Sequence, residues 1–206
     1  PAAAPAAAPH FDEEMLPYVE VGMANASLKG EDKCCWAEAT IGGEKVVFVM
    51  VADGHGGKEA SAWLHEHLLA AFIARAGDDP SGAALRAAGR SVFIEAHATI
   101  CAMKNHTAGS TLTVVAVNSA RAEITTVNVG DSGALMIENS KAVPLSEDHR
   151  LEDNERERER VTNLGGKLAR AANSQGQPCG PIRVWPGGVV QARALGDRDV
   201  GDLIDA

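Results

Sequence analysis

The order of the elements that the sequence predicts favours an α+β fold, in which helices are layered on antiparallel sheet. Short runs rich in β-branched residues come first, two adjacent alanine-rich helices follow, and several further short strands precede a charged helix. Segregated runs of strands and helices indicate this class, whereas parallel sheets need the two to alternate. The length of 206 residues, against a typical domain of about 150 residues, favours one domain over residues 18–206.

The N-terminal half is expected to hold two or three strands and two helices. Residues 18–28 predict a first strand, and residues 34–41 predict a second that turns at Gly42 and Gly43 into the buried strand 45–52. After the glycine cluster at 54–57, apolar residues recur at helical spacing as far as residues 78–80. A second helix follows to about residue 103, and both are rich in alanine, the best helix former.

The C-terminal half is expected to be mainly antiparallel strands with one further helix. Residues 112–117, 123–129 and 134–137 predict strands of hairpins. Residues 152–162 predict a helix with opposite charges three residues apart. We interpret its Glu/Arg run as a solvent-exposed face, with a docking surface as the alternative. The glycine- and proline-rich residues 173–188 predict a surface loop, before a last strand around 189–194.

Charge and hydropathy argue against two classes of partner. The chain carries 19 Lys and Arg against 28 Asp and Glu, for a net charge of −9, which disfavours attraction to nucleic acid or to anionic lipid. The longest strongly apolar stretch, residues 46–52, is far shorter than the roughly 20 residues of a membrane-spanning helix. We therefore expect no nucleic acid and no membrane as partner.

The N-terminus and the cysteines bear on the compartment. Residues 1–9 alternate alanine and proline and resemble neither a secretory signal nor a transit peptide, so residues 1–17 are predicted to be a disordered leader. The four cysteines form no CxxC pair or other metal spacing. Reduced thiols, and hence a cytoplasmic or nuclear location, are the expectation.

Several acidic residues follow or flank the expected strands. Asp53 opens the run DGHGG between a buried strand and a helix, where a carboxylate can hold a hard cation and the glycines permit close approach. Glu31 and Asp32 lie at the end of the first expected strand, and the hairpin that follows leads back to Asp53, so antiparallel pairing can gather all three. Asp131 comes just after strand 123–129. Taken singly, each of these acids also fits an ordinary turn.

Seven stretches in the same order resemble the protein phosphatase type 2C family, the metal-dependent Ser/Thr phosphatases. They are Glu31 with Asp32, the DGHGG run, GSTL at 109–112, VGDS at 129–132, SEDH at 146–149, NLGG at 163–166 and ARALGDRDVG at 192–201. The resemblance implies a β-sandwich of two antiparallel sheets flanked by helices, with two Mn or Mg ions at one end. The sequence ends before two later Asp motifs of the family, which implies a sandwich that is incomplete at the C-terminus.

The resemblance also implies a set of metal ligands. Glu31 and Asp53 would bind the ions, Asp53 as the bridge, and Gly54 would contribute its carbonyl oxygen. Asp32 would bind or support them, and Asp131 would match an acid associated with a weaker additional metal. Oxygen ligands suit Mg and Mn better than zinc.

The resemblance further assigns the chemistry of the site. His55 would be the general acid that protonates the departing Ser or Thr oxygen, while the ions held through Asp53 activate a water for in-line attack on phosphorus. The family commonly carries a phosphate-binding Arg four residues before the metal-binding Glu, and Ser27 stands there. Lys29, which is basic and close by, is assigned to phosphate binding, although a point charge does not replace a bidentate fork.

The resemblance thus implies a Ser/Thr protein phosphatase with a dinuclear Mg or Mn site, phosphorylated proteins as partners, and a monomeric state when complete. The alternative is a catalytically weak or inactive fragment, or a pseudophosphatase, that acts as a phosphoprotein-binding module. Intact Glu31, Asp53 and His55 favour the enzyme, whereas Ser27 and the missing Asp motifs favour the alternative.

Overall fold

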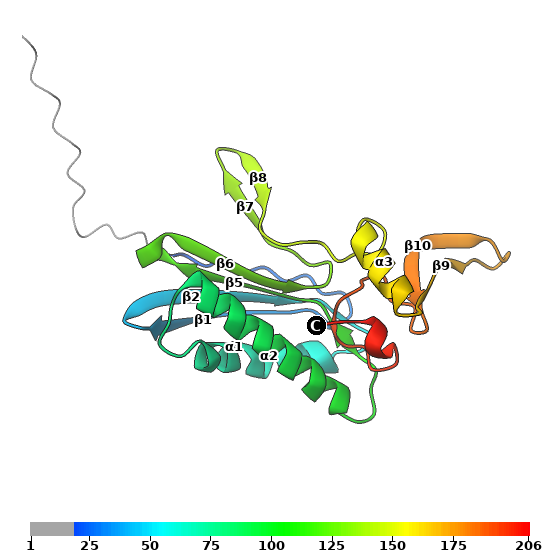
Figure 1. The fold of residues 1–206 in the computed structure, drawn as a ribbon, viewed down its shortest axis with the longest axis horizontal. Coiled ribbons are helices and arrows are strands. Elements are labelled where there is room, and N and C mark those ends of the chain that lie inside the picture. Colours follow the sequence, from blue (N-terminus) through cyan, green and yellow to red (C-terminus); the bar gives the residue numbers. More distant parts are fainter. Residues whose placement is uncertain (1–18) are drawn as a thin grey trace, which may run out of the picture.

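The computed structural model describes residues 19–206, so the predicted leader at residues 1–17 lies outside the described residues. Its centre is a four-stranded antiparallel sheet in the order β1-β2-β5-β6 (Figure 1). The strands are β1 (Lys33–Ile41), β2 (Glu44–Ala52), β5 (Leu112–Asn118) and β6 (Glu123–Val129). The expected hairpin is confirmed, since Gly42 and Gly43 both adopt positive φ at the β1–β2 turn.

Two long helices cover one face of this sheet, as Figure 1 shows. They are α1 (Glu59–Ala76) and α2 (Gly82–Ala102). Alternate residues of β2 point to the helices, and Phe48 meets Phe72 of α1 with ring centroids 5.4 Å apart. Ser81 caps α2 by accepting a hydrogen bond from the Ala84 amide. The predicted helices are thus confirmed, and they form the main core with the sheet.

The remaining elements form three small sheets and a short helix. A three-stranded sheet has the order β11-β4-β3, and two hairpins project from the body as β7-β8 and β9-β10. The strands are β3 (Gly54–His55), β4 (Gly109–Ser110), β7 (Leu135–Glu138), β8 (Lys141–Pro144), β9 (Lys167–Ala172), β10 (Pro178–Trp185) and β11 (Leu195–Gly196), and the helix is α3 (Glu155–Asn163). The mixed α+β class with antiparallel sheets and helices is confirmed.

Three local expectations are wrong. Residues 19–28 form no strand, and the first strand of the described chain is β1. The loop expected at 173–188 instead contains β10, because its glycines and prolines are accommodated by a register shift between Cys179 and Ile182 rather than by a break in pairing. Residues 189–194 make only isolated bridges at Val189, Gln191 and Arg193.

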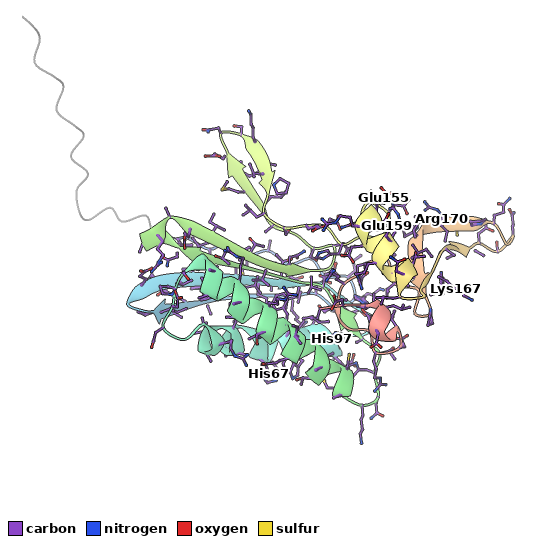
Figure 2. All side chains as sticks on the ribbon, in the orientation of Figure 1. His67, His97, Glu155, Glu159, Lys167 and Arg170 are labelled. Carbon is purple, nitrogen blue, oxygen red and sulfur yellow. The ribbon has the colours of Figure 1, made fainter. Side chains whose placement is uncertain are left out.

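The charged helix α3 also differs from expectation. Figure 2 shows Glu155 and Glu159 on α3 beside Lys167 and Arg170 of β9, and both glutamates are exposed. Glu157, between them, is buried: its two carboxylate oxygens accept hydrogen bonds from Arg160 Nε at 2.7 Å and from Arg193 Nε at 2.8 Å. The exposed-face interpretation is therefore wrong for this residue, whose partner Arg193 lies far along the chain.

A second, smaller core lies under α3. Its buried members are Leu151, Val161, Val184, Ala192, Ala194, Val200 and Ile204. This cluster joins α3 to the C-terminal segment. Within residues 19–206, neither long helix has the apolarity that a membrane span requires.

Candidate active site

The small β3-β4-β11 sheet positions Asp53 and His55. Asp53 stands between β2 and β3, its carbonyl oxygen accepts the Thr111 amide at 2.9 Å, and its amide donates to Thr111 Oγ1 at 3.3 Å. His55 lies in β3 and pairs with Gly109 of β4. The backbone around both residues is thus fixed by the stretch 109–112, which the sequence had singled out.

Acidic residues from three segments gather around Asp53. Because Lys33 of β1 pairs with Ala52 of β2, Asp32 immediately before β1 lies next to Asp53 immediately after β2. Asp131 follows the end of β6, which lies at the same end of the sheet as the end of β2. Partial loss of solvent raises the pKa of Asp53, and the charges of Asp32 and Asp131 raise it further. Glu31 and Asp32 therefore share the sheet end expected for them, although they precede a strand rather than end one.

Glu31 lies beside this group but has partners of its own. Its Oε1 accepts the Gly57 amide at 2.9 Å, and its Oε2 is 3.8 Å from Nζ of Lys29. Ser61 donates its hydroxyl to the Glu31 carbonyl oxygen. A Cβ at Gly54 would overlap that same carbonyl, so only glycine permits this approach of the two chain segments. Lys29 is largely exposed, and its predicted phosphate-binding role stays a prediction.

Asp131 is held by a basic neighbour. Its Oδ2 accepts a hydrogen bond from Arg150 Nη1 at 2.7 Å, and the two side chains form an ion pair. Next to it, the hydroxyls of Ser132 and Thr111 are 2.6 Å apart. The VGDS stretch is thereby tied to Thr111, which lies between β4 and β5, and to Arg150, which directly follows the SEDH stretch.

The carboxylates around Asp53 offer oxygen ligands of the kind that bind a hard cation, although their side chains do not surround one common point. Within residues 19–206, no three His, Cys, Asp or Glu side chains converge as a bound metal requires. Asp32 and Asp53 form no ion pair with another residue of that range. Two adjacent carboxylates without a basic partner are oxygen ligands of the kind that Mg and Mn prefer. The predicted ligand roles of Glu31, Asp32, Asp53, Gly54 and Asp131 stay predictions.

His55 is held by polar side chains from the C-terminal segment. Its Nε2 lies 2.9 Å from both carboxylate oxygens of Asp197, and the Gln191 amide nitrogen is 3.1 Å from Nε2 and 3.3 Å from Nδ1. Burial lowers the pKa of His55, but the hydrogen bond and charge of Asp197, with the charges of Asp53 and Asp131, outweigh it and raise the pKa overall.

His55 also borders two clefts. One, of about 390 Å³, is lined by Ser27, Lys29, Asp32 and Asp53 among others. The second, of about 290 Å³, lies on the Asp197 side and includes Arg183 in its wall. A ligand in the first cleft would therefore contact the carboxylates and His55 together.

Four residues that contact the predicted site residues were given no role from the sequence: Thr111, Arg150, Gln191 and Asp197. Asp197 and Thr111 lie in stretches that were recognised as matches, ARALGDRDVG and GSTL, but a motif match gives a residue no role by itself. Gln191 and Arg150 meet their partners only through tertiary contacts. The one signal that could have pointed to Asp197 was that the matched stretch at 192–201 contains acids without an assigned role, Asp197 and Asp199.

His149, of the SEDH stretch, supports the Asp131 loop and makes stability depend on pH. Its Nδ1 accepts the Gly130 amide at 3.1 Å, and burial, with the charge of Arg193, lowers its pKa. At this position the unfolded chain therefore binds a proton near the ordinary histidine pKa while the folded chain does not, so the contribution of His149 to stability falls as pH drops below about 6.5.

We expect His149→Asn, which can keep an acceptor near the Gly130 amide, to lose less stability than the wild type between about pH 7 and about pH 5. Urea unfolding at both pH values measures this, with the exposed His65→Asn as control. Identical pH dependence in wild type and His149→Asn would contradict the assignment.

Comparison with known proteins gives consistent matches. The family model described as Protein phosphatase 2C matches residues 18–203. Among curated relatives, "Probable protein phosphatase 2C 5" of Arabidopsis thaliana is 35% identical over 201 residues, which cover 91% of this chain and 46% of the relative. "Probable protein phosphatase 2C 15" of the same plant is 36% identical and covers 91% and 45%. The chain thus spans about half the length of these curated relatives.

Solved structures show the same similarity. A C. elegans sex-determining protein superposes with a TM-score of 0.68 at 27% identity, covering 87% of this chain and 43% of that one. A serine-threonine phosphatase 2C from Toxoplasma gondii has a TM-score of 0.62 at 20% identity, covering 84% and 65%, and this similarity concerns the fold.

Proposed function

Because the chain belongs to the protein phosphatase 2C family, we propose that it hydrolyses phosphoserine and phosphothreonine in proteins with the aid of Mg or Mn. The observation that carries this proposal is the placement of Asp32 and Asp53 beside His55 on one cleft. Asp32 and Asp53, which form no ion pair within residues 19–206, lie next to an imidazole ring that can transfer a proton. Hydrolysis of a phosphate monoester is assisted by both kinds of group: the carboxylates bind cations, and the imidazole protonates the leaving oxygen.

Different residues of the cleft would bind the metal, donate the proton and attract the phosphate. Asp32 and Asp53 would hold the metal, with Glu31, the Gly54 carbonyl and Asp131 as further proposed ligands. When bound, Mg or Mn supplies an activated water and offsets charge on the phosphoryl oxygens. His55 gives a proton to the departing Ser or Thr oxygen, which is a poor leaving group without one. Lys29, exposed on the cleft wall, would attract the phosphate.

A second candidate is a phosphoprotein-binding module without turnover. It is favoured by the contacts of Glu31 with Gly57 and of Asp131 with Arg150, which occupy two of the proposed ligands. Ser27, whose hydroxyl accepts the Asp32 amide at 3.2 Å, stands on the cleft wall where the family resemblance calls for arginine.

The 206-residue chain is expected to hydrolyse a phosphothreonine peptide only with added Mn or Mg, because the proposed ligands are oxygen atoms of a hard-cation site. Release of phosphate is measured with each metal and in excess EDTA, and binding of the same peptide is measured by calorimetry. Full turnover in EDTA contradicts the metal mechanism. Peptide binding without turnover in any metal supports the second candidate instead.

A further inference from the structure

Asp197 is a buried carboxylate to which the proposed function gives no role. Its side chain is 4% exposed, and within residues 19–206 its ion-pair partner is His55. Burying a carboxylate is strongly unfavourable unless its oxygens accept hydrogen bonds or face a positive charge. Here both oxygens lie 2.9 Å from a single atom, His55 Nε2. The cost of burying the Asp197 carboxylate is thus offset by one imidazole ring, that of His55, which is the proposed proton donor.

Three short strands bring this pair together. His55 of β3 pairs with Gly109 of β4, and Gly109 pairs with Gly196 of β11, which places Asp197 beside the ring. A Cβ at position 109 would overlap the Asp197 carboxylate. The carboxylate can therefore occupy this place only because residue 109 is glycine. Asp197 itself adopts φ of 51°, an uncommon conformation for a residue other than glycine. Strain of this kind is often found at functional sites.

We propose that Asp197 is a positioning residue, which accepts the Nε2–H of His55 and so makes Nδ1 the nitrogen that passes a proton to the leaving oxygen. The inference rests on the proposed function of His55 as the proton donor. Asp197 touches neither substrate nor metal in this account and acts through the ring. A carboxylate on one ring nitrogen fixes both the orientation of an imidazole and its tautomer.

Proton transfer from His55 accompanies cleavage of the phosphate ester. Water forms a bond to phosphorus as the bond from phosphorus to the Ser or Thr oxygen breaks. The leaving oxygen takes the proton from Nδ1, and the attacking water, now part of the phosphate, releases one proton to solvent. His55 is left neutral with its remaining proton on Nε2, facing Asp197, and it regains a proton on Nδ1 from solvent. The side chain of Gln191 packs against the ring, with its amide nitrogen 3.1 Å from Nε2 and 3.3 Å from Nδ1.

The first test does not depend on activity. Long-range ¹H–¹⁵N spectra of the 206-residue chain, recorded at a pH where His55 is neutral, should show the Nε2–H tautomer. In Asp197→Asn, which keeps the size of the side chain but can also donate a hydrogen bond, the tautomers should become mixed. Asp202→Asn is the matched control, since this aspartate is exposed on the same C-terminal segment, and it should match the wild type.

The second test uses two leaving groups. Asp197→Asn should lower kcat by about 10- to 100-fold on a phosphoserine peptide and by less than about threefold on p-nitrophenyl phosphate, whose phenolate leaves without a proton. Gly109→Ala, which displaces the Asp197 carboxylate, should show the same split. Far-UV circular dichroism checks that each variant is folded.

The outcomes separate this inference from the proposed function. An Nδ1–H tautomer in the wild type, an unchanged tautomer in Asp197→Asn, or equal losses on both substrates overturns the role of Asp197. Absence of turnover by the wild type on both substrates overturns the proposed function. In that case the role in proton transfer falls with it, while the spectra still decide whether Asp197 orients His55.

Discussion

Asp53→Asn is expected to lower Mn-dependent phosphatase turnover by about a thousandfold. Cations held by a site of this kind contribute several kcal/mol to catalysis, and the loss of about 4 kcal/mol corresponds to a factor of about 1,000 in rate. The amide keeps the size of the carboxylate, so the backbone contacts of residue 53 with Thr111 should persist. Turnover is measured with a phosphothreonine peptide over a range of Mn concentrations.

The same substitution should not destabilise the protein. Asp53 lies next to Asp32 and near Asp131, and removal of its charge relieves repulsion among them. In EDTA, the free energy of unfolding of Asp53→Asn should therefore equal or slightly exceed that of the wild type. The control is Asp78→Asn, an exposed aspartate in the connection between α1 and α2. A variant that loses turnover together with stability would indicate a structural role for Asp53.

Glu157→Gln is expected to lower the free energy of unfolding by about 2 kcal/mol at neutral pH. Removing one partner from a buried ion pair costs about 3–5 kcal/mol, and the cost is smaller here because the side chains of Arg160 and Arg193 are 23% and 25% exposed and can be hydrated. Urea unfolding measures the change. Glu159→Gln, on the exposed face of the same helix, should change stability by less than about 0.5 kcal/mol.

The effect of Glu157 should depend on pH with a defined sign. Burial raises its pKa, but hydrogen bonds and charge from Arg160 and Arg193 outweigh this and lower it overall. A lowered pKa means that the carboxylate stabilises the fold above its ordinary pKa and that this contribution is lost as pH falls. Wild type and Glu157→Gln should therefore converge in acid. A difference that stays constant, or equal effects of Glu157→Gln and Glu159→Gln, would show that the buried pair does not stabilise the fold.

Local patterns were sufficient to predict the main core. The helical spacing of Leu64, Leu68 and Phe72 and the apolar strand 45–52 are periodicities that burial against one neighbour imposes, so α1 and β2 lie where expected. Residues 19–28 were misassigned because their mixed apolar and small polar residues follow no such period. β10 was missed because glycine and proline are typical of loops, and its pairing tolerates them only through a bulge.

The candidate site was predictable where its residues belong to matched stretches, and less so where it depends on tertiary contacts. Asp53 and His55 stand in one run of sequence, and antiparallel pairing was enough to bring Asp32 to them. Glu157 looked like one more charge on a solvated helix, since its burial depends on Arg193 from a distant segment. Asp197 meets His55 only once β4 and β11 have paired.

The β3-β4-β11 sheet has a consequence for the order in which the protein folds. Its three strands come from segments separated by long stretches of chain, so it closes large loops and gains only two residue pairs at each pairing. The β1–β2 hairpin and the two helices instead form from neighbouring segments, which is faster. Asp53 can thus be in place while His55 still lacks Asp197, because β11 follows β3 and β4 in the chain and is synthesised after them. Amide hydrogens of β4 and β11 should exchange through small local openings that leave the main sheet intact, so the site is lost before the core unfolds.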